Sequence, residues 1–182
     1  MKITNVICAA LLAVGCLAAQ PTTKDPVVGG SAMYPTKDII DNAVNSADHT
    51  TLVAAVKAAG LVDTLKGAGP FTVFAPTNEA FGKLPAGTVD TLVKPENKDT
   101  LTKILTYHVV PGRISAMDLK KQIKAGKGKA ELTTVEGEKL TARMSGSRIV
   151  IQDAKGGMAT ISIPNVFQSN GVIHVVDSVL MP

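Results

Sequence analysis

Aromatic side chains are scarce in this sequence. Its 182 residues include no tryptophan, and phenylalanine and tyrosine together make up only 3%. Proteins that bind single-stranded nucleic acids stack bases on aromatic side chains inside a basic groove. Five lysines do lie between Lys120 and Lys129, but no aromatic residue separates them. We therefore interpret this run as the solvated face of a helix and expect no nucleic-acid partner.

Long apolar runs are missing beyond the first 19 residues. The chain opens with Lys2, an apolar run from Val6 to Val14, and small residues ending at Ala19. This is the pattern of a secretory signal peptide, which we assign to residues 1–19. The run is too short for a stable membrane span, and no later stretch reaches the required length. We therefore expect an exported protein that is periplasmic, secreted or held at the cell surface.

Cysteine is almost absent, because Cys8 and Cys16 both lie in this leader and the rest of the chain has no thiol. Disulfides, thiolate metal sites and cysteine nucleophiles are thus excluded from the body of the protein. Residues 13–16 (AVGC) resemble the lipobox of bacterial lipoproteins, although the leucine usual in that motif is displaced by one position. Ala18 or Ala19 also suits an ordinary signal peptidase. Ordinary secretion and lipidation of Cys16, the one expected membrane tether, therefore remain two alternatives.

Catalytic motifs are absent as well. No serine stands in a Gly-x-Ser-x-Gly elbow, and the sequence has no phosphate-binding glycine loop. His49, His108 and His174 lie far apart, without the close spacing of a local metal site. We therefore predict no catalytic residue, no metal and no cofactor, and a protein that is not an enzyme.

The remaining sequence indicates a short linker followed by one domain. Residues 20–35 are rich in proline, threonine and glycine and are predicted to form a flexible linker before a domain at 36–182. Thr36 is expected to cap the first of several helices, and Gly60 to end a later one. Thr77 follows a short apolar strand and is expected to cap another helix.

The pattern changes after Lys129 from helical spacing to short apolar runs separated by glycine turns, which predict hairpins. Asn170-Gly171 is a strong hairpin signal between two of these strands. The last strand is apolar at successive positions from Val172, which indicates burial on both faces. Helices first and strands last predict an α+β domain.

Three segments together are similar to the first block, the Tyr-His motif and the second block of fasciclin domains: Gly69–Phe81 (GPFTVFAPTNEAF), Tyr107–Val110 (YHVV) and Asn170–Pro182 (NGVIHVVDSVLMP). The likeness extends over roughly residues 36–182. It implies a fasciclin-like fold of N-terminal helices packed on a C-terminal wedge or sandwich of β-strands. It also implies a secreted or surface protein with a role in cell adhesion or extracellular binding.

The resemblance implies that the Tyr-His motif contacts a partner through five residues: Leu105, Tyr107, His108, Val109 and Val110. The residues themselves offer a second interpretation, a packed junction of helix and strand with a hydrogen-bonded histidine. Exposure of the motif would favour the first interpretation and burial the second.

The function that we expect is an extracytoplasmic module for cell adhesion, which binds a protein or glycan at the cell surface or in the matrix. The alternative is a periplasmic or surface binder of a small apolar ligand, held between the helices and the strands. A dry, well-formed pocket would favour this alternative.

Overall fold

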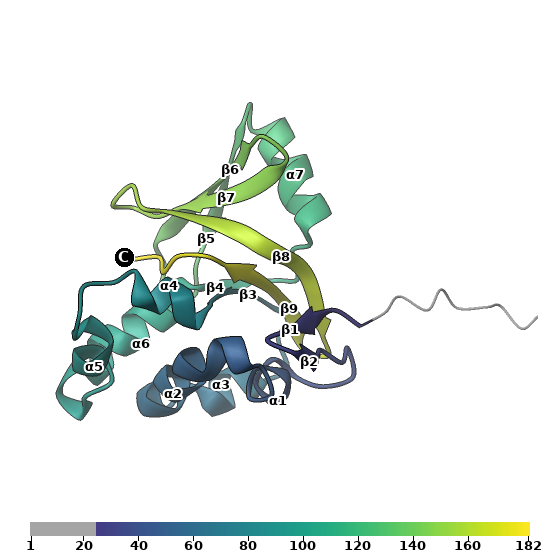
Figure 1. The fold of residues 1–182 in the computed structure, drawn as a ribbon. Helices are drawn as coiled ribbons and strands as arrows, with labels where there is room; N and C mark the ends of the chain where they lie inside the picture. Colours follow the sequence, from purple (N-terminus) through teal and green to yellow (C-terminus); the bar gives the residue numbers. More distant parts are fainter. Residues whose placement is uncertain (1–24) are drawn as a thin grey trace, which may run out of the picture.

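The computed structural model describes residues 25–182, so the predicted signal peptide and Cys16 lie outside the described residues. Figure 1 shows helices α1–α6 gathered on one side of a sheet, while helix α7 lies against the far part of the same sheet. No helix within residues 25–182 is long and apolar enough to cross a membrane.

The helical side is built from short helices that follow one another closely in the chain. The helices and 3-10 turns of the described residues are α1 (Ile39–Ala43), η1 (Ala47–His49), α2 (Thr50–Ala59), α3 (Val62–Lys66), α4 (Asn78–Gly82), α5 (Thr88–Leu92), η2 (Pro95–Asn97), α6 (Lys98–Tyr107) and α7 (Ala116–Ala125).

The main sheet has seven strands in the order β4-β3-β9-β8-β7-β6-β5. They are β3 (Phe71–Pro76), β4 (Val109–Pro111), β5 (Lys129–Thr133), β6 (Lys139–Ser145), β7 (Arg148–Gln152), β8 (Met158–Gln168) and β9 (Gly171–Val176). Strands β3 and β9 run parallel and all other neighbours run antiparallel. The Val135 N–H donates to the Val109 carbonyl at 2.8 Å, so the two ends of the sheet meet and it nearly closes like a barrel. This arrangement confirms the predicted α+β, fasciclin-like fold.

Strand β8 joins the part of the sheet formed by β5–β7 to the part formed by β9, β3 and β4. Its 11 residues pair with β7 at one end and with β9 at the other, and its register shifts between Ile161 and Val166. Such bulges bend a strand and increase its twist. Residues 158–168 are therefore one bent strand that belongs to both pairings.

Two hydrophobic clusters fill the interior. The first lies between helices α1–α6 and one face of the β3–β9 pair, and the second lies between α7 and strands β5–β8. Strand β9 is buried at all six positions, with Ile173 and Val175 in the first cluster and Val172 and Val176 on its other side. The predicted burial of this strand on both faces is confirmed.

Two of the three predicted helix ends are confirmed. Gly60 ends α2 in the left-handed conformation, and the Thr77 hydroxyl accepts a hydrogen bond from the Ala80 N–H at the start of α4. The predicted cap of the first helix is wrong by two positions. Asp38, rather than Thr36, caps α1, because its carboxylate accepts the Asp41 N–H.

Part of the expected linker is ordered. Residues 25–35 contain a small hairpin of β1 (Val27–Val28) and β2 (Ser31–Ala32), and Val28 and Met33 are buried in the first cluster. The prediction of a flexible linker over 20–35 is therefore wrong for these residues. Two apolar side chains and backbone pairing offset the entropy of ordering a segment whose composition is typical of a loop.

Candidate functional site

The Tyr-His motif is buried. The five predicted contact residues are only 0–5% exposed, so none is available to a partner in this structure: Leu105, Tyr107, His108, Val109 and Val110. Tyr107 ends α6, His108 caps it, and β4 begins at the next residue. The expectation of a contact surface at these residues is corrected, because both core clusters cover them.

The phenol group of Tyr107 connects three segments. Its oxygen accepts a hydrogen bond from the Ala154 N–H at 3.0 Å and its O–H donates to the Lys139 carbonyl at 3.4 Å. Ala154 follows β7 and Lys139 begins β6. Burial raises the pKa of Tyr107 above its ordinary value, so the phenol stays protonated and keeps its donor.

His108 is held as one neutral tautomer. Its Nδ1–H donates to the Ile104 carbonyl at 2.8 Å, and its Nε2 accepts from the Leu180 N–H at 3.0 Å. A proton on Nε2 would remove this acceptor, so the pair of bonds requires the uncharged ring. Burial lowers the pKa of His108 to about 4, which keeps the ring neutral at physiological pH.

His174 has a similar structural role on β9. Its Nε2–H donates to the Ile114 carbonyl at 2.9 Å, and its Nδ1 accepts from the Asn165 N–H at 3.3 Å. Asn165 in turn accepts the Ala116 N–H at 2.7 Å through its side-chain oxygen, at the start of α7. Burial lowers the pKa of His174, so this ring is also neutral and serves to join β9 to α7.

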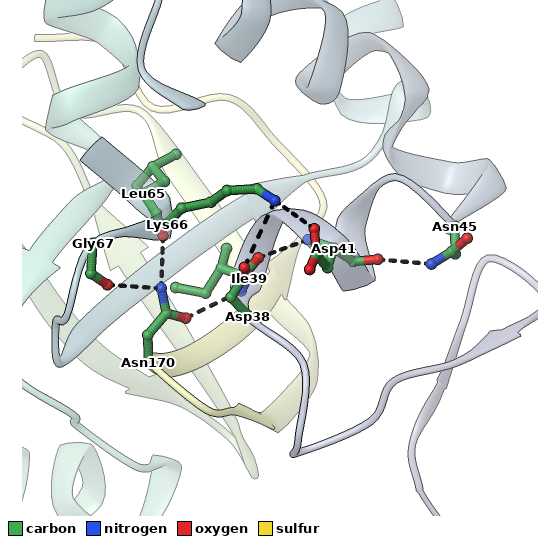
Figure 2. Close-up of polar contacts among 8 residues, drawn as sticks. All are labelled: Asp38, Ile39, Asp41, Asn45, Leu65, Lys66, Gly67 and Asn170. Atoms are coloured by element: carbon green, nitrogen blue, oxygen red, sulfur yellow. Dashed lines mark hydrogen bonds and ion pairs between the residues drawn. The ribbon is translucent and has the colours of Figure 1, made fainter. Parts of the chain in front are cut away.

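Asn170 joins the second block to the helices, which Figure 2 shows in detail. Its side-chain oxygen accepts the Ile39 N–H at 3.1 Å, and its amide donates to the carbonyls of Leu65 at 2.7 Å and Gly67 at 3.1 Å. The hairpin predicted at Asn170 is confirmed by the pairing of β8 with β9. Local sequence patterns do not reveal that this side chain also binds α1 and α3, because Ile39 and Leu65 lie 131 and 105 residues away.

Gly171 is required by close approach of the chain. A Cβ atom at this position would lie 2.2 Å from the Phe71 carbonyl oxygen and 3.0 Å from a methyl of Ile39. Any side chain here would therefore push β9 away from β3 or from α1. The Asn-Gly pair thus fixes the junction of sheet and helices as well as the turn.

An apolar cavity of about 40 Å³ lies between the helices and the sheet. Its lining includes Val28, Ile40, Val56 and Ile173, and one polar atom beside it, Nε2 of His49, has no hydrogen-bond partner among the described residues. The other ring nitrogen of His49 is 2.9 Å from the Ser46 hydroxyl. Engineered cavities that admit benzene measure about 150 Å³, so this space is too small for an organic ligand in this conformation.

Metal-binding side chains do not cluster in the part of the chain that the structure describes. Residues 25–182 contain no group of three or more histidine, cysteine, aspartate or glutamate side chains placed to hold an ion. Asp153 is buried but its carboxylate is occupied, accepting the N–H groups of Lys155, Gly157 and Met181 at 2.7–3.1 Å. Lys155 and Gly157 belong to the local turn after β7, whereas Met181 comes from the C-terminal tail and is brought to Asp153 only by folding.

The chain belongs to the fasciclin family, since residues 47–182 match the Fasciclin domain. Domains of this family are typically non-catalytic binding modules. A solved structure with the same fold is a FAS1 domain pair from the insect cell adhesion molecule Fasciclin I, with a TM-score of 0.56 and 22% identity. The match covers 77% of this chain and 45% of that one, and it shows the fold alone.

Bacterial relatives are similar over most of the chain. Protein sll1483 of Synechocystis is 47% identical over 163 residues, which cover 90% of this chain and 83% of the relative. Immunogenic protein MPT70 of Mycobacterium tuberculosis is 34% identical over 208 residues, covering 100% and 99%. Cell surface glycolipoprotein MPB83 of Mycobacterium bovis is 36% identical over 179 residues, covering 94% and 72%.

Proposed function

We propose that this chain is an extracytoplasmic adhesion or interaction module that binds a protein or glycan through its outer surface. The observation that carries the proposal is the burial of the polar side chains that family resemblance and sequence had singled out. The polar atoms of Tyr107, His108 and His174 form hydrogen bonds inside the domain. A partner would therefore be recognised by other residues, which are exposed on the surface of the domain.

One relative supports a location outside the cytoplasm, because MPB83 of Mycobacterium bovis is named a cell surface glycolipoprotein. The leader at residues 1–19 supports export, and Cys16 would supply a lipid tether. Intact-mass measurement of the protein from membrane and soluble fractions tests this: a diacylated or triacylated Cys16 means a tethered protein, and a chain that begins near Ala19 or Gln20 means a free one.

The binding proposal is tested with the purified protein and isolated cell-envelope fractions. We expect saturable binding that exceeds that of an unrelated protein of similar size and charge, and that excess unlabelled protein competes away. Binding equal to the control for envelope, whole cells and extracellular matrix would overturn the proposal.

The alternative, a binder of small apolar ligands, has less support. Pockets for drug-sized ligands measure about 300–1,000 Å³, and the cavity beside His49 has about 40 Å³. Several core side chains would have to move before such a ligand could enter. Native mass spectrometry of protein recovered from its source would reveal a retained ligand and would then favour this alternative.

A further inference from the structure

A row of exposed lysines marks the outer side of α7. Lys120, Lys121 and Lys124 are exposed on the helix, and Lys127 and Lys129 are exposed in the turn and strand that follow. We call these five residues the lysine ridge. The opposite side of α7 is buried in the second cluster, so the exposed lysines of this helix face away from the core. Figure 1 shows α7 at the outer part of the sheet, beside strands β6–β8.

Positive charge is concentrated at this ridge. Residues 115–129 contain five lysines and a single carboxylate, that of Asp118, whereas residues 36–114 contain eight basic and eight acidic side chains. Among the described residues, none of the five lysines forms an ion pair. The ridge lysines therefore have no carboxylate in direct contact, although Lys121 and Lys129 act electrostatically on the carboxylates of Asp118 and Glu131 and help to lower their pKa values.

The carboxylates nearest in sequence are already occupied. Asp118 forms the capping box with Ser115, and this contact lowers its pKa. Glu131 pairs with Lys139 at 2.9 Å. Neither carboxylate forms an ion pair with a ridge lysine.

The remaining acids of this part of the molecule are also committed. Glu136 and Glu138 lie 3.4 Å and 3.7 Å from the ammonium group of Lys103, which comes from α6. The Asp153 carboxylate accepts backbone N–H groups. The acids are thus used within the fold, and the positive charge is left facing outward.

Lys127 stands where glycine is usual. The Gly128 N–H donates to the Ile123 carbonyl at 2.8 Å, the bond that closes a Schellman turn after α7. Lys127 occupies the left-handed position of this turn with φ 55°. A residue with a Cβ atom is strained there, and the Lys127 side chain forms no hydrogen bond or ion pair within residues 25–182 that would compensate for it.

The spacing within α7 adds a second cost. Lys120 and Lys124 are four residues apart and Lys121 and Lys124 are three apart, so their side chains are neighbours and repel one another. Only Lys124 lies in the last turn, where the helix dipole favours a cation. The strained backbone at Lys127 and the repulsion among the helix lysines both lower the stability of the fold. Because both occur at one exposed site, we infer that the charge serves an external ligand.

We propose that the lysine ridge binds an acidic polysaccharide, which names a partner class for the proposed function and rests on it. A chain of carboxylate or sulfate groups can meet several cations at once, and these five are distributed over a helix, the turn after it and the start of β5. An anionic membrane is the less favoured occupant, because Met117 is the one large apolar side chain exposed on α7 and neither an aromatic nor a leucine side chain is exposed there to enter the lipid. Nucleic acid is less favoured for the same lack of aromatic groups.

The test compares two quadruple variants of the purified protein. In the ridge variant Lys120, Lys121, Lys124 and Lys127 are changed to glutamine. The matched control variant carries the same change at four exposed lysines elsewhere that form no ion pair among residues 25–182: Lys57, Lys94, Lys98 and Lys155. Binding to immobilised polygalacturonate, dextran sulfate and neutral dextran is measured at increasing salt, and circular dichroism confirms the fold.

We expect binding to one or both acidic polymers and none to neutral dextran. The ridge variant should lose about tenfold or more in affinity, and the control variant less than about threefold. Single replacement Lys127→Gly, which relieves the strained position, should weaken binding while the fold is retained.

Equal losses in the two quadruple variants would mean attraction by net charge alone and would overturn the proposal. If the protein bound neither acidic polymer at low salt, the proposal would also be overturned. Binding to cell envelopes tests the proposed adhesion function independently of this result. Ridge-dependent binding to phosphatidylglycerol vesicles or to single-stranded DNA, without binding to the polysaccharides, would assign the ridge to a different partner.

Discussion

The imidazole Nε2 of His108 accepts the backbone N–H of Leu180 at 3.0 Å, although 72 residues separate them in the sequence. This bond fastens the C-terminal tail to the end of α6. Met181 is held beside it by the Asp153 carboxylate at 3.1 Å. The Tyr-His motif and the end of the second block are therefore parts of one internal junction.

Acid should destabilise the protein through His108. The pKa falls from 6.5 in the unfolded chain to about 4 in the fold because of burial. As the pH drops from about 6.5 to about 4, the unfolded state binds a proton that the folded state refuses, so the free energy of unfolding should fall by about 3 kcal/mol. His49 and His174 act in the same direction, since burial lowers both pKa values.

Urea unfolding at several pH values between about 7.5 and 5 checks this, because the carboxylates titrate mainly below that window. The variant His108→Gln should be less stable at neutral pH but show a shallower dependence on pH. An identical dependence in the two proteins would contradict the assignment of the titrating group to His108.

Tyr107→Phe should cost about 1–2 kcal/mol of stability, because the Ala154 N–H loses its acceptor in a part-buried position. The matched control is Tyr34→Phe, since Tyr34 is 44% exposed and its loss of a hydroxyl should change stability by less than about 0.5 kcal/mol. Thermal and urea unfolding measure both. If Tyr107→Phe instead weakened binding to envelopes without loss of stability, the motif would have to contact a partner.

Asn170→Ala should be among the most destabilising polar substitutions. It removes three hydrogen bonds and leaves the Ile39 N–H and two carbonyls without partners, at a cost of about 2 kcal/mol or more. Asn45→Ala is the control, because Asn45 is exposed and makes one bond to the Asp41 carbonyl. Similar losses in the two variants would show that Asn170 does not join the hairpin to the helices.

Lys127→Gly should stabilise the protein by about 1 kcal/mol, because glycine adopts the left-handed conformation without strain. The same change inside the helix, Lys124→Gly, should destabilise it by about 1 kcal/mol. Urea unfolding of both variants gives the two signs directly. Destabilisation by Lys127→Gly would mean that the lysine side chain contributes to the folded state in a way that its contacts do not show.

Local signals predicted much of the fold. The helix cap at Thr77 and the helix end at Gly60 depend on residues within a few positions, so the sequence contains both partners of each contact. The apolar run of β9 likewise predicted a buried strand. The order of helices and strands followed from these local patterns, and the three family segments then identified the fold.

Neighbouring residues specify the fold class, the family and the charge of the lysine ridge, so these three can be predicted before folding is considered. The burial of the Tyr-His motif, the packing of the hairpin at residues 27–32 and the small size of the cavity follow from tertiary contacts. The ion pairs of Glu131, Glu136 and Glu138 have the same origin. Burial and pairing depend on which distant segments come together. Apolar residues that repeat every 3.6 positions in a helix or every 2 in a strand carry no information about those partners.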